Sequence, residues 1–132
     1  MIIGIGNDLV DIRRIEKTLK THKERFITRC FSKSEQEQLA QRKEDQRASF
    51  LAKRFAAKEA CVKALGSGFV GDIYLKDISV ERDDLGKPSL VLTGGALERL
   101  IELSPNNLKP HLHLSLSDEP PYASAFVILE AR

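Results

Sequence analysis

A lysine and a glutamate lie side by side in the run RFAAKEACVKALGSG (residues 54–68), which is otherwise typical of a buried helix that ends at a glycine. On a helical wheel of residues 46–65, Lys58 falls inside the apolar stripe and Glu59 falls at its edge. Lys63 lies further round, on the side of Glu59. The stripe itself is formed by Leu51, Phe55, Val62 and Leu65. Charged residues that interrupt an apolar stripe often mark a functional site.

Ordinary helix chemistry also explains this pattern. The Lys58 side chain can run along apolar surface until its ammonium group reaches water. Glu59 and Lys63 have the i,i+4 spacing of a surface ion pair, which stabilises a helix by about 0.2–0.5 kcal/mol. The helix pattern alone therefore leaves a structural role and a catalytic role open.

Asp8 is a second residue that could do chemistry. The apolar run MIIGIG (residues 1–6) predicts a buried strand that stops at Asn7 and Asp8. The Asp8 carboxylate would then either cap the following helix or be held at a strand end, a position suited to a metal ligand. Asp8 and Glu59 are far apart in the sequence, so only the tertiary structure can bring them together.

If Asp8 and Glu59 meet, the predicted chemistry is phosphoryl-type transfer. Two carboxylates and several waters suit Mg²⁺, which keeps much of its hydration and binds substrate phosphates. Lys58 and Lys63 would supply positive charge to phosphate oxygens. Backbone N–H groups of the GSG run (residues 66–68) would add hydrogen-bond donors. Metal and lysines together would offset the charge that develops during transfer.

The elements that must position these residues favour an α+β fold, in which a largely antiparallel sheet packs with a long helix and shorter helices. The predicted order is strand, helices, hairpin, helix, hairpin, and not an alternating βαβα chain. Helices are expected over about 11–20, from a capping box at Ser32–Glu35 or Ser34–Glu37, over about 46–65 and over 94–103. Hairpins are expected around the DLGKP run and around Pro120–Pro121. We expect a single domain over residues 1–132, in which the first strand and the last hairpin could share a sheet.

Composition narrows the class of protein. The chain is 42% hydrophobic and carries a formal net charge of only +2, which fits one compact domain and not a general nucleic-acid binder. Its two cysteines, Cys30 and Cys61, are expected to be buried and reduced. The N-terminus lacks the basic region of a signal peptide, and no apolar run reaches membrane-spanning length. We therefore expect a cytoplasmic protein with no membrane partner.

Positive charge is concentrated in residues 11–29. This stretch has seven basic residues and three acidic ones, so its local charge exceeds that of the whole chain. Arg13, Lys17 and Lys20 follow helical spacing on the side away from the apolar stripe of the predicted helix. A solvated face explains such a run, and so does a docking surface for an acidic partner. Nucleic acid is not expected here, because no aromatic residues alternate with the charges.

The runs GIGNDLVDIRRIE and RFAAKEACVKALGSG resemble the two signature blocks of the holo-acyl-carrier-protein synthases. These are the short members of the 4'-phosphopantetheinyl transferase superfamily, and the resemblance continues through DLGKPSLVL and HLHLSLSDEPPYASAFVILE. It implies transfer of phosphopantetheine from coenzyme A to a serine of apo-acyl carrier protein, with release of adenosine 3',5'-bisphosphate. It also implies Mg²⁺, a homotrimer, and coenzyme A bound in clefts between subunits.

The resemblance assigns roles to residues of this chain. Asp8 and Glu59 match the two acids that bind the metal, Lys63 matches the lysine that faces the pyrophosphate, and Lys58 is the motif's own lysine. The expected catalytic residues are Asp8, Glu59 and Lys63. Contacts with coenzyme A are expected from Lys58, Lys63, Arg54, Gly66 and Ser67. Contacts with the acidic carrier are expected from Arg13, Arg14, Lys17 and Lys20. The proton acceptor for the carrier's serine stays open between Glu59 and a metal-bound water.

Two positions depart from the family pattern. Val10 stands where larger superfamily members have a third acidic ligand, so water or the pyrophosphate would fill that coordination position. Asp118 stands where many short members have a histidine, and we assign it no role in the site. Two other functions fit the residues less well: a Mg²⁺-dependent hydrolase of nucleotide pyrophosphates, and a non-catalytic module that binds an acidic helical partner.

Overall fold

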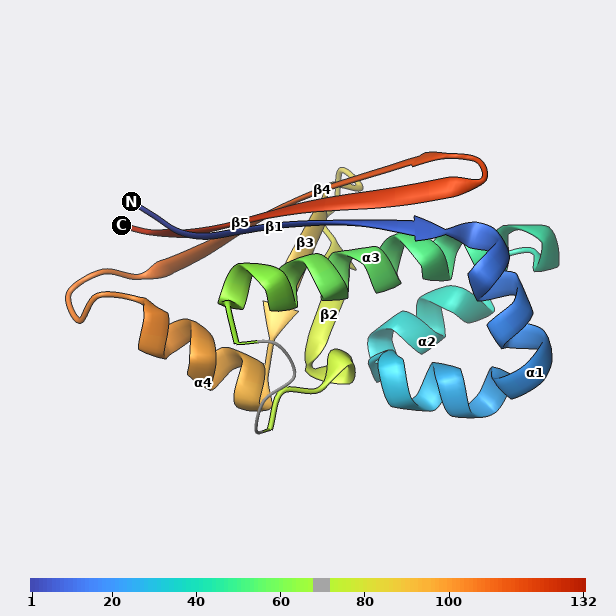
Figure 1. Cartoon of the computed structure of the whole chain (residues 1–132), viewed down its shortest axis with the longest axis horizontal. Coiled ribbons are helices and arrows are strands. Elements are labelled where there is room, and N and C mark those ends of the chain that lie inside the picture. Colours follow the sequence, from blue (N-terminus) through green and yellow to red (C-terminus); the bar gives the residue numbers. More distant parts are fainter. Residues whose placement is uncertain (68–71) are drawn as a thin grey trace.

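The computed structural model describes residues 1–67 and 72–132 (Figure 1). The strands are β1 (Ile2–Asp11), β2 (Ile78–Arg82), β3 (Pro88–Leu92), β4 (Pro110–Glu119) and β5 (Tyr122–Ala131). The α-helices are α1 (Ile12–Cys30), α2 (Lys33–Ala40), α3 (Arg47–Leu65) and α4 (Gly94–Leu103). Short 3-10 helices, η1 (Glu44–Gln46) and η2 (Leu75–Asp77), precede α3 and β2. The elements follow the predicted order, and the predicted α+β class is confirmed.

Both sheets are antiparallel. One contains three strands in the order β1–β5–β4, and the other is the β2–β3 hairpin. The first strand and the last hairpin therefore share a sheet. Figure 1 shows this sheet running along one side of α3, with α1 and α2 near one end of that helix and α4 near the other. The sheet and α3 together form the frame in which Asp8 and Glu59 are placed.

The strand β1 lies unusually close to α3, and two glycines make this possible. A Cβ atom added at Gly6 would lie 1.9 Å from the carbonyl oxygen of Ala60, and one added at Gly4 would lie 2.1 Å from that of Ala64. Both distances are far below van der Waals contact, so any side chain at these positions would push the strand away. The GIG run of the sequence thus sets the spacing between β1 and α3.

The helix α3 is the centre of the core. Twelve of its 19 residues are buried, and many of them are alanines, which let neighbouring backbones approach. The predicted stripe is confirmed: Leu51, Val62 and Leu65 are buried, and Phe55 is partly buried against the core. The helix ends at Gly66, whose φ of 72° is the left-handed conformation that glycine adopts most readily.

Two boundaries differ from the sequence prediction. The strand β1 does not stop at Asn7, because its pairing with β5 continues from Asp8 opposite Ala125 to Asp11 opposite Tyr122. Asp8 is therefore inside the strand, and it is Asp11 that caps α1 by accepting a hydrogen bond from the Arg13 backbone. The helix α1 also runs on to Cys30, with a kink at His22 (φ −139°, ψ 38°).

The predicted capping box at the start of α2 is confirmed. Of the two possible capping boxes, Ser32–Glu35 is the one that opens α2: the Ser32 hydroxyl accepts from the Glu35 N–H, and Glu35 accepts from the Ser32 N–H. Cys61 is buried as expected, whereas Cys30, which was also expected to be buried, is only half-buried; the two do not form a disulfide. Within residues 1–67 and 72–132, no helix is long and apolar enough to cross a membrane.

Candidate active site

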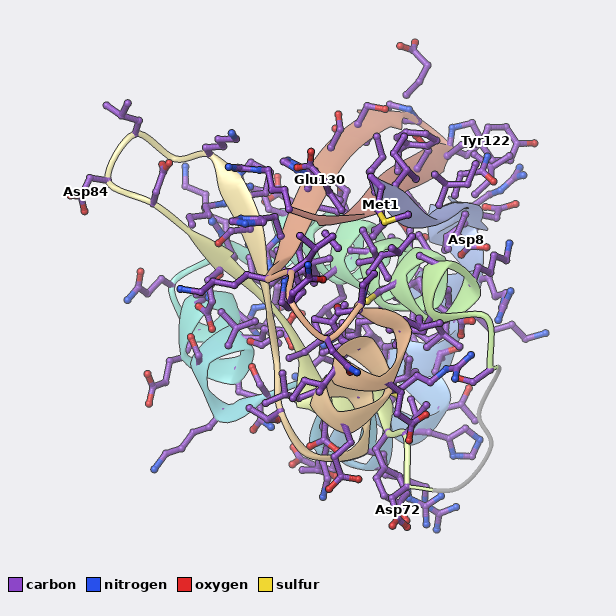
Figure 2. All side chains as sticks on the ribbon, turned by 90° about the vertical axis from the view of Figure 1, so that its left-hand side faces the viewer. Met1, Asp8, Asp72, Asp84, Tyr122 and Glu130 are labelled. Carbon is purple, nitrogen blue, oxygen red and sulfur yellow. The ribbon has the colours of Figure 1, made fainter. Side chains whose placement is uncertain are left out.

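Asp8 lies on the face of β1 that packs against α3, and Figure 2 shows it beside the ribbon of that helix. Its side chain is 17% exposed. The Nζ atom of Lys63 is 3.1 Å from Asp8 Oδ1 and also donates a hydrogen bond of 3.0 Å to the carbonyl oxygen of Asn7. A residue of the first sequence block and a residue of the second are thus in direct contact.

Glu59 precedes Lys63 by one turn of α3 and belongs to the same cluster. Burial, and then the negative charge of Asp8, raise the pKa of Glu59 above its ordinary value. The positive charges of Lys63 and Arg14 act in the opposite direction. Asp8 and Glu59 are thus close enough for the charge of Asp8 to raise the pKa of Glu59.

The donor set fits Mg²⁺. Carboxylate oxygens are the hard ligands that Mg²⁺ prefers, and one or two of them per ion are typical of sites that also bind substrate phosphates. In the part of the chain that the structure describes, no group of three or more His, Cys, Asp or Glu residues could hold a metal. Val10, at the position of the larger relatives' third acid, is buried in the core. Asp8 and Glu59 would therefore leave the other coordination positions to water and substrate.

Lys58 does not join this cluster, which corrects the sequence prediction. Its side chain is fully buried, and Nζ lies 2.5 Å from Glu35 Oε1. The same ammonium donates to the carbonyl oxygens of Leu75 (3.1 Å) and Ile78. These three bonds use every proton of the ammonium group. A contact between Lys58 and a substrate phosphate is not compatible with this arrangement.

Glu35 is the residue that the sequence interpretation missed. Besides Lys58, it accepts hydrogen bonds from the backbone N–H groups of Ser32 and Val80. Its position in a capping box predicted the start of a helix. The capping hydrogen bonds involve only neighbouring residues, so the motif does not indicate a buried ion pair. The only sequence signal for the pair is that Lys58 interrupts the apolar stripe and needs a partner.

Arg54 is also fully buried, at the floor of a separate pocket. Its guanidinium lies 3.7 Å from the centre of the Phe50 ring, and Nη2 donates to Gln38 Oε1 at 2.9 Å. Its Nε and Nη1 atoms are buried without a hydrogen-bond partner among the described residues. Burial lowers the pKa of Arg54 to about 10. The pocket is otherwise strongly basic; its charged lining residues are Arg42, Asp45, Lys53, Arg54 and Arg82.

Gly66 and Ser67, the two other expected contacts with coenzyme A, differ in their surroundings. The Gly66 N–H caps α3 by donating to the carbonyl oxygens of Val62 and Lys63, so the N–H of Gly66 is already used. Ser67 lines a shallow pocket together with Asp72 and Arg99, on the α4 side of the molecule. Gly68, the last residue of the GSG run, lies outside the described residues.

The basic residues of α1 are exposed, as expected. Arg13 forms a bidentate ion pair with Asp11, with Nη2–Oδ2 at 2.7 Å and Nε–Oδ1 at 2.9 Å. Arg14 lies over the Phe55 ring, 5.9 Å from its centre, and is close enough to Glu59 to lower the pKa of that carboxyl. Lys17 and Lys20 continue the exposed face along the helix. The first turn of this face therefore borders the Asp8–Glu59–Lys63 cluster.

Comparison with known proteins agrees with this geometry. The sequence model of the 4'-phosphopantetheinyl transferase superfamily matches residues 4–125. The chain belongs to this superfamily. It is 55% identical over 131 residues to the holo-acyl-carrier-protein synthase of a Caulobacter species, covering 99% of this chain and 97% of that one. It is 50% identical to the synthase of Brucella ovis, with coverage of 99% and 96%.

Solved structures of the superfamily share the fold. The synthase of Neisseria meningitidis superposes with a TM-score of 0.84 at 37% identity, covering 98% of this chain and 99% of that one. The synthase of Bacillus anthracis, solved in complex with coenzyme A (3',5'-ADP), gives 0.81 at 35% identity, with coverage of 100% and 99%. The chain is thus a transferase of the holo-acyl-carrier-protein synthase family, and the expectation of an enzyme is confirmed.

Proposed function

We propose that this chain transfers 4'-phosphopantetheine from coenzyme A to a serine of apo-acyl carrier protein, with Mg²⁺ as cofactor and adenosine 3',5'-bisphosphate as the second product. The observation that carries this proposal is the contact of Lys63 with Asp8, beside a Glu59 carboxylate whose pKa responds to the charges of both. A solved relative, that of Bacillus anthracis, holds coenzyme A. The full-length similarity to synthases supports the choice of acceptor.

Asp8 and Glu59 would hold the magnesium ion. When bound, the ion supplies charge neutralisation to the diphosphate, so that a nucleophile can approach its phosphorus. Asp8 is fixed in a strand and Glu59 in a buried helix, so both carboxylates are held before substrate arrives. Such preorganisation is the main contribution that a protein makes to phosphoryl-type transfer.

Two further steps fall to groups of the chain. The carrier's serine hydroxyl attacks the β-phosphorus of coenzyme A in line and must lose a proton. Glu59 is the carboxylate whose pKa is raised by burial and by Asp8, so it is a stronger base than an exposed glutamate and suits this role. Lys63 carries an ammonium group that can donate to the leaving phosphate as the P–O bond breaks.

The Arg54 pocket is the candidate contact for another phosphate of coenzyme A. Two buried guanidinium nitrogens of Arg54 have no partner among the described residues, and three further basic side chains line the pocket. Five residues of an α-helix turn through about 140° net, so Arg54 and Glu59 project in different directions from α3. This favours an assembly in which one coenzyme A molecule bridges the metal site of one subunit and the Arg54 pocket of another.

The outer face of the three-stranded sheet supports a homotrimer. Large apolar side chains stand out from it: Ile5 is 59% exposed, Leu9 66%, Tyr122 44% and Phe126 46%. They lie on the adjacent strands β1 and β5 and so form one patch. An exposed apolar patch of this kind is typical of a surface that is covered by another protein. We assign this face to contacts between subunits.

The exposed basic face of α1 is the candidate docking surface for the acidic carrier. Complementary charge speeds encounter and fixes orientation more than it adds affinity. Arg14 lies at the border between this face and Glu59. A carrier that docks along Arg13, Arg14, Lys17 and Lys20 would therefore present its serine next to the metal site.

A mass measurement tests the proposal. The chain is incubated with coenzyme A, Mg²⁺ and an apo-carrier, and the carrier is then weighed by mass spectrometry. We expect a gain of one phosphopantetheine group. Hydrolysis of coenzyme A without a change in the carrier would indicate a pyrophosphate hydrolase instead, and no reaction of either kind would leave a binding module as the better description.

Variants locate the chemistry within the chain. Asp8→Asn and Glu59→Gln are expected to lower the rate of transfer by at least about a hundredfold, because each removes a charged ligand from the transition state. Asp84→Asn is the matched control, because Asp84 is exposed in the β2–β3 loop, far from Asp8 in Figure 2. Near-normal transfer by Asp8→Asn or Glu59→Gln would rule out the metal site proposed here.

A further inference from the structure

One carboxylate oxygen of the candidate site already has a cation beside it. Asp8 Oδ1 accepts a hydrogen bond from Lys63 Nζ at 3.1 Å. The same ammonium group is anchored by the carbonyl oxygen of Asn7 at 3.0 Å, so its position over β1 is defined by two bonds. Lys63 is also one helical turn from Glu59, and its positive charge opposes the rise in the pKa of that carboxyl. Its charge therefore acts on both carboxylates.

An ammonium group and a divalent ion compete for such an oxygen. Mg²⁺ binds carboxylate oxygens directly at short range and requires a regular shell of ligands around it. The Lys63 ammonium, 3.1 Å from Asp8 Oδ1, would lie beside that shell of ligands, and the two positive charges would repel each other. While Lys63 stays on Oδ1, its charge repels a divalent ion that binds either oxygen of Asp8, so the ion binds more strongly once Lys63 has moved away.

The Lys63 side chain has room to change its conformation, whereas the Asp8 side chain has little. The Lys63 side chain is 56% exposed and sits on the last turn of α3, with a flexible four-carbon stem. Asp8 is 17% exposed and held inside a paired strand. The incoming diphosphate of coenzyme A offers several anionic oxygens, which give the Lys63 ammonium an alternative partner.

We propose that Lys63 couples the binding of the metal to the binding of the substrate. In the free chain, its ammonium group occupies Asp8 and weakens the affinity for a divalent ion. When a diphosphate binds, Lys63 transfers to it and releases Asp8 to the ion, so metal and substrate bind with positive cooperativity. By linkage, the metal then strengthens substrate binding by the same factor. This inference rests on the proposed function, because it takes the diphosphate from coenzyme A.

The test is a titration with Mn²⁺, followed by electron paramagnetic resonance, on the chain alone without coenzyme A or carrier. The Lys63→Met variant is expected to bind Mn²⁺ about two- to fivefold more tightly than the wild type, the range that a partly exposed ion pair supports. Most substitutions in a metal site lower the affinity for the metal. A gain in Mn²⁺ affinity is therefore the result expected if Lys63 competes with the ion for Asp8. Because Lys63 is half exposed, this change is not expected to disturb folding.

Two controls separate competition from a general effect of charge. Lys53→Met also removes one positive charge and one ion pair from α3, but that pair is with Asp118 at 3.7 Å; its Mn²⁺ affinity is expected to equal that of the wild type. In an Asp8→Asn background, Lys63→Met is expected to give a clearly smaller gain, because the contested oxygen no longer carries charge and only the effect of Lys63 on Glu59 remains. Saturating coenzyme A is expected to raise Mn²⁺ affinity by a larger factor in the wild type than in Lys63→Met.

The outcomes distinguish this inference from the proposed function. Equal or weaker Mn²⁺ binding by Lys63→Met overturns the coupling role, even if the wild type modifies the carrier normally. A gain of the same size in the Asp8→Asn background, or one that Lys53→Met reproduces, overturns it as well. If Lys63→Met shows the gain but the wild type does not modify any carrier, the competition at Asp8 is supported and the proposed transferase reaction is the part that fails.

Discussion

At the scale of single residues, the two lysines of the second sequence block have opposite roles. Lys63 is half exposed and reaches the strand that carries Asp8, whereas Lys58 is sealed in the core and bonded to Glu35. The difference follows from where each falls on α3, since five residues along a helix separate two directions by about 140°. The chemistry that we propose for the block thus involves Glu59 and Lys63, whereas Lys58 stabilises the core.

The pKa of Glu59 leads to a prediction on stability. In the folded chain, burial and Asp8 raise this pKa above the ordinary 4.5, so the folded chain holds the proton more tightly than the unfolded chain does. Ionisation of Glu59 therefore lowers the free energy of unfolding as the pH rises through the raised pKa. Below a pH equal to the ordinary pKa, this loss is absent. In the presence of a chelator, Glu59→Gln is expected to melt at a higher temperature than the wild type near neutral pH.

The pH profile of the difference is the decisive measurement. The advantage of Glu59→Gln should shrink as the pH falls and disappear below 4.5, where the wild-type carboxyl is protonated in both states. Calorimetry across this range measures it. A lower melting temperature for Glu59→Gln near neutral pH would contradict the electrostatic account of this carboxylate.

At the scale of elements, the site depends on how closely β1 packs against α3. The glycines at positions 4 and 6 and the alanines at positions 60 and 64 allow the two backbones to touch. This contact places Asp8 over the turn of α3 that carries Glu59 and Lys63. The spacing of the site is therefore set by residues that have no polar side chain.

Gly6→Ala is predicted to lower the free energy of unfolding by at least about 2 kcal/mol, because its methyl group would overlap the Ala60 carbonyl and force the strand outward. Denaturation by urea measures the change. Asn7→Ala is the control, because the Asn7 side chain is on the exposed side of the same strand. Equal stability of Gly6→Ala and the wild type would mean that β1 does not need this close approach.

The buried Lys58–Glu35 pair joins three elements. Through Lys58, α3 is bonded to α2 at Glu35 and to the η2–β2 segment at the carbonyl oxygens of Leu75 and Ile78. Burial lowers the pKa of Lys58, and the charge of Glu35 opposes that effect, so each charge is tolerated because of the other.

Lys58→Met should cost about 3–5 kcal/mol of stability, because it leaves Glu35 as an unpaired buried charge. The double variant Lys58→Met, Glu35→Gln should recover part of this loss. It removes the second charge and keeps one oxygen, which can accept from the N–H group of either Ser32 or Val80; in the wild type these two groups bond to different oxygens of Glu35. A double-mutant cycle by urea denaturation measures the coupling, and a double variant less stable than Lys58→Met would argue against the pairing.

At the scale of the whole molecule, the exposed apolar face of the three-stranded sheet is the feature that a single chain does not explain. Arg54 and Glu59 also differ by about 140° around α3, which is why we propose that one substrate reaches both through two copies of the chain. Phe126→Glu is predicted to dissociate the proposed trimer, because it buries a charge in an apolar interface.

Sedimentation velocity distinguishes trimer from monomer for Phe126→Glu and the wild type. Transfer activity should fall in parallel with the loss of trimer. Val91→Glu is the control, because Val91 is a similarly exposed apolar residue on the separate β2–β3 sheet. A wild-type chain that sediments as a monomer would contradict the assignment of this face.

Local patterns in the sequence predicted much of this protein. The capping box at Ser32, the glycine cap at Gly66 and the apolar stripe of α3 are each encoded within a few neighbouring residues, and each was found where expected. The two signature blocks identified the family and pointed to Asp8, Glu59 and Lys63. The ends of β1 and α1 were misplaced. The polar residues Asn7 and Asp8 look like a strand end unless their pairing with β5 is known, and α1 runs on to Cys30 beyond the predicted end near residue 20.

The contacts between distant segments were decided by the tertiary structure alone. Nothing near Lys58 in the sequence indicates that its partner is Glu35 on another helix, or that Arg54 is buried over Phe50. The sequence by itself determined which residues carry charge and which elements present them. Whether an ammonium group is buried against one carboxylate or exposed beside another depends on which backbone segments pack together. That packing joins residues far apart in the sequence, so no periodic pattern in the sequence predicts it.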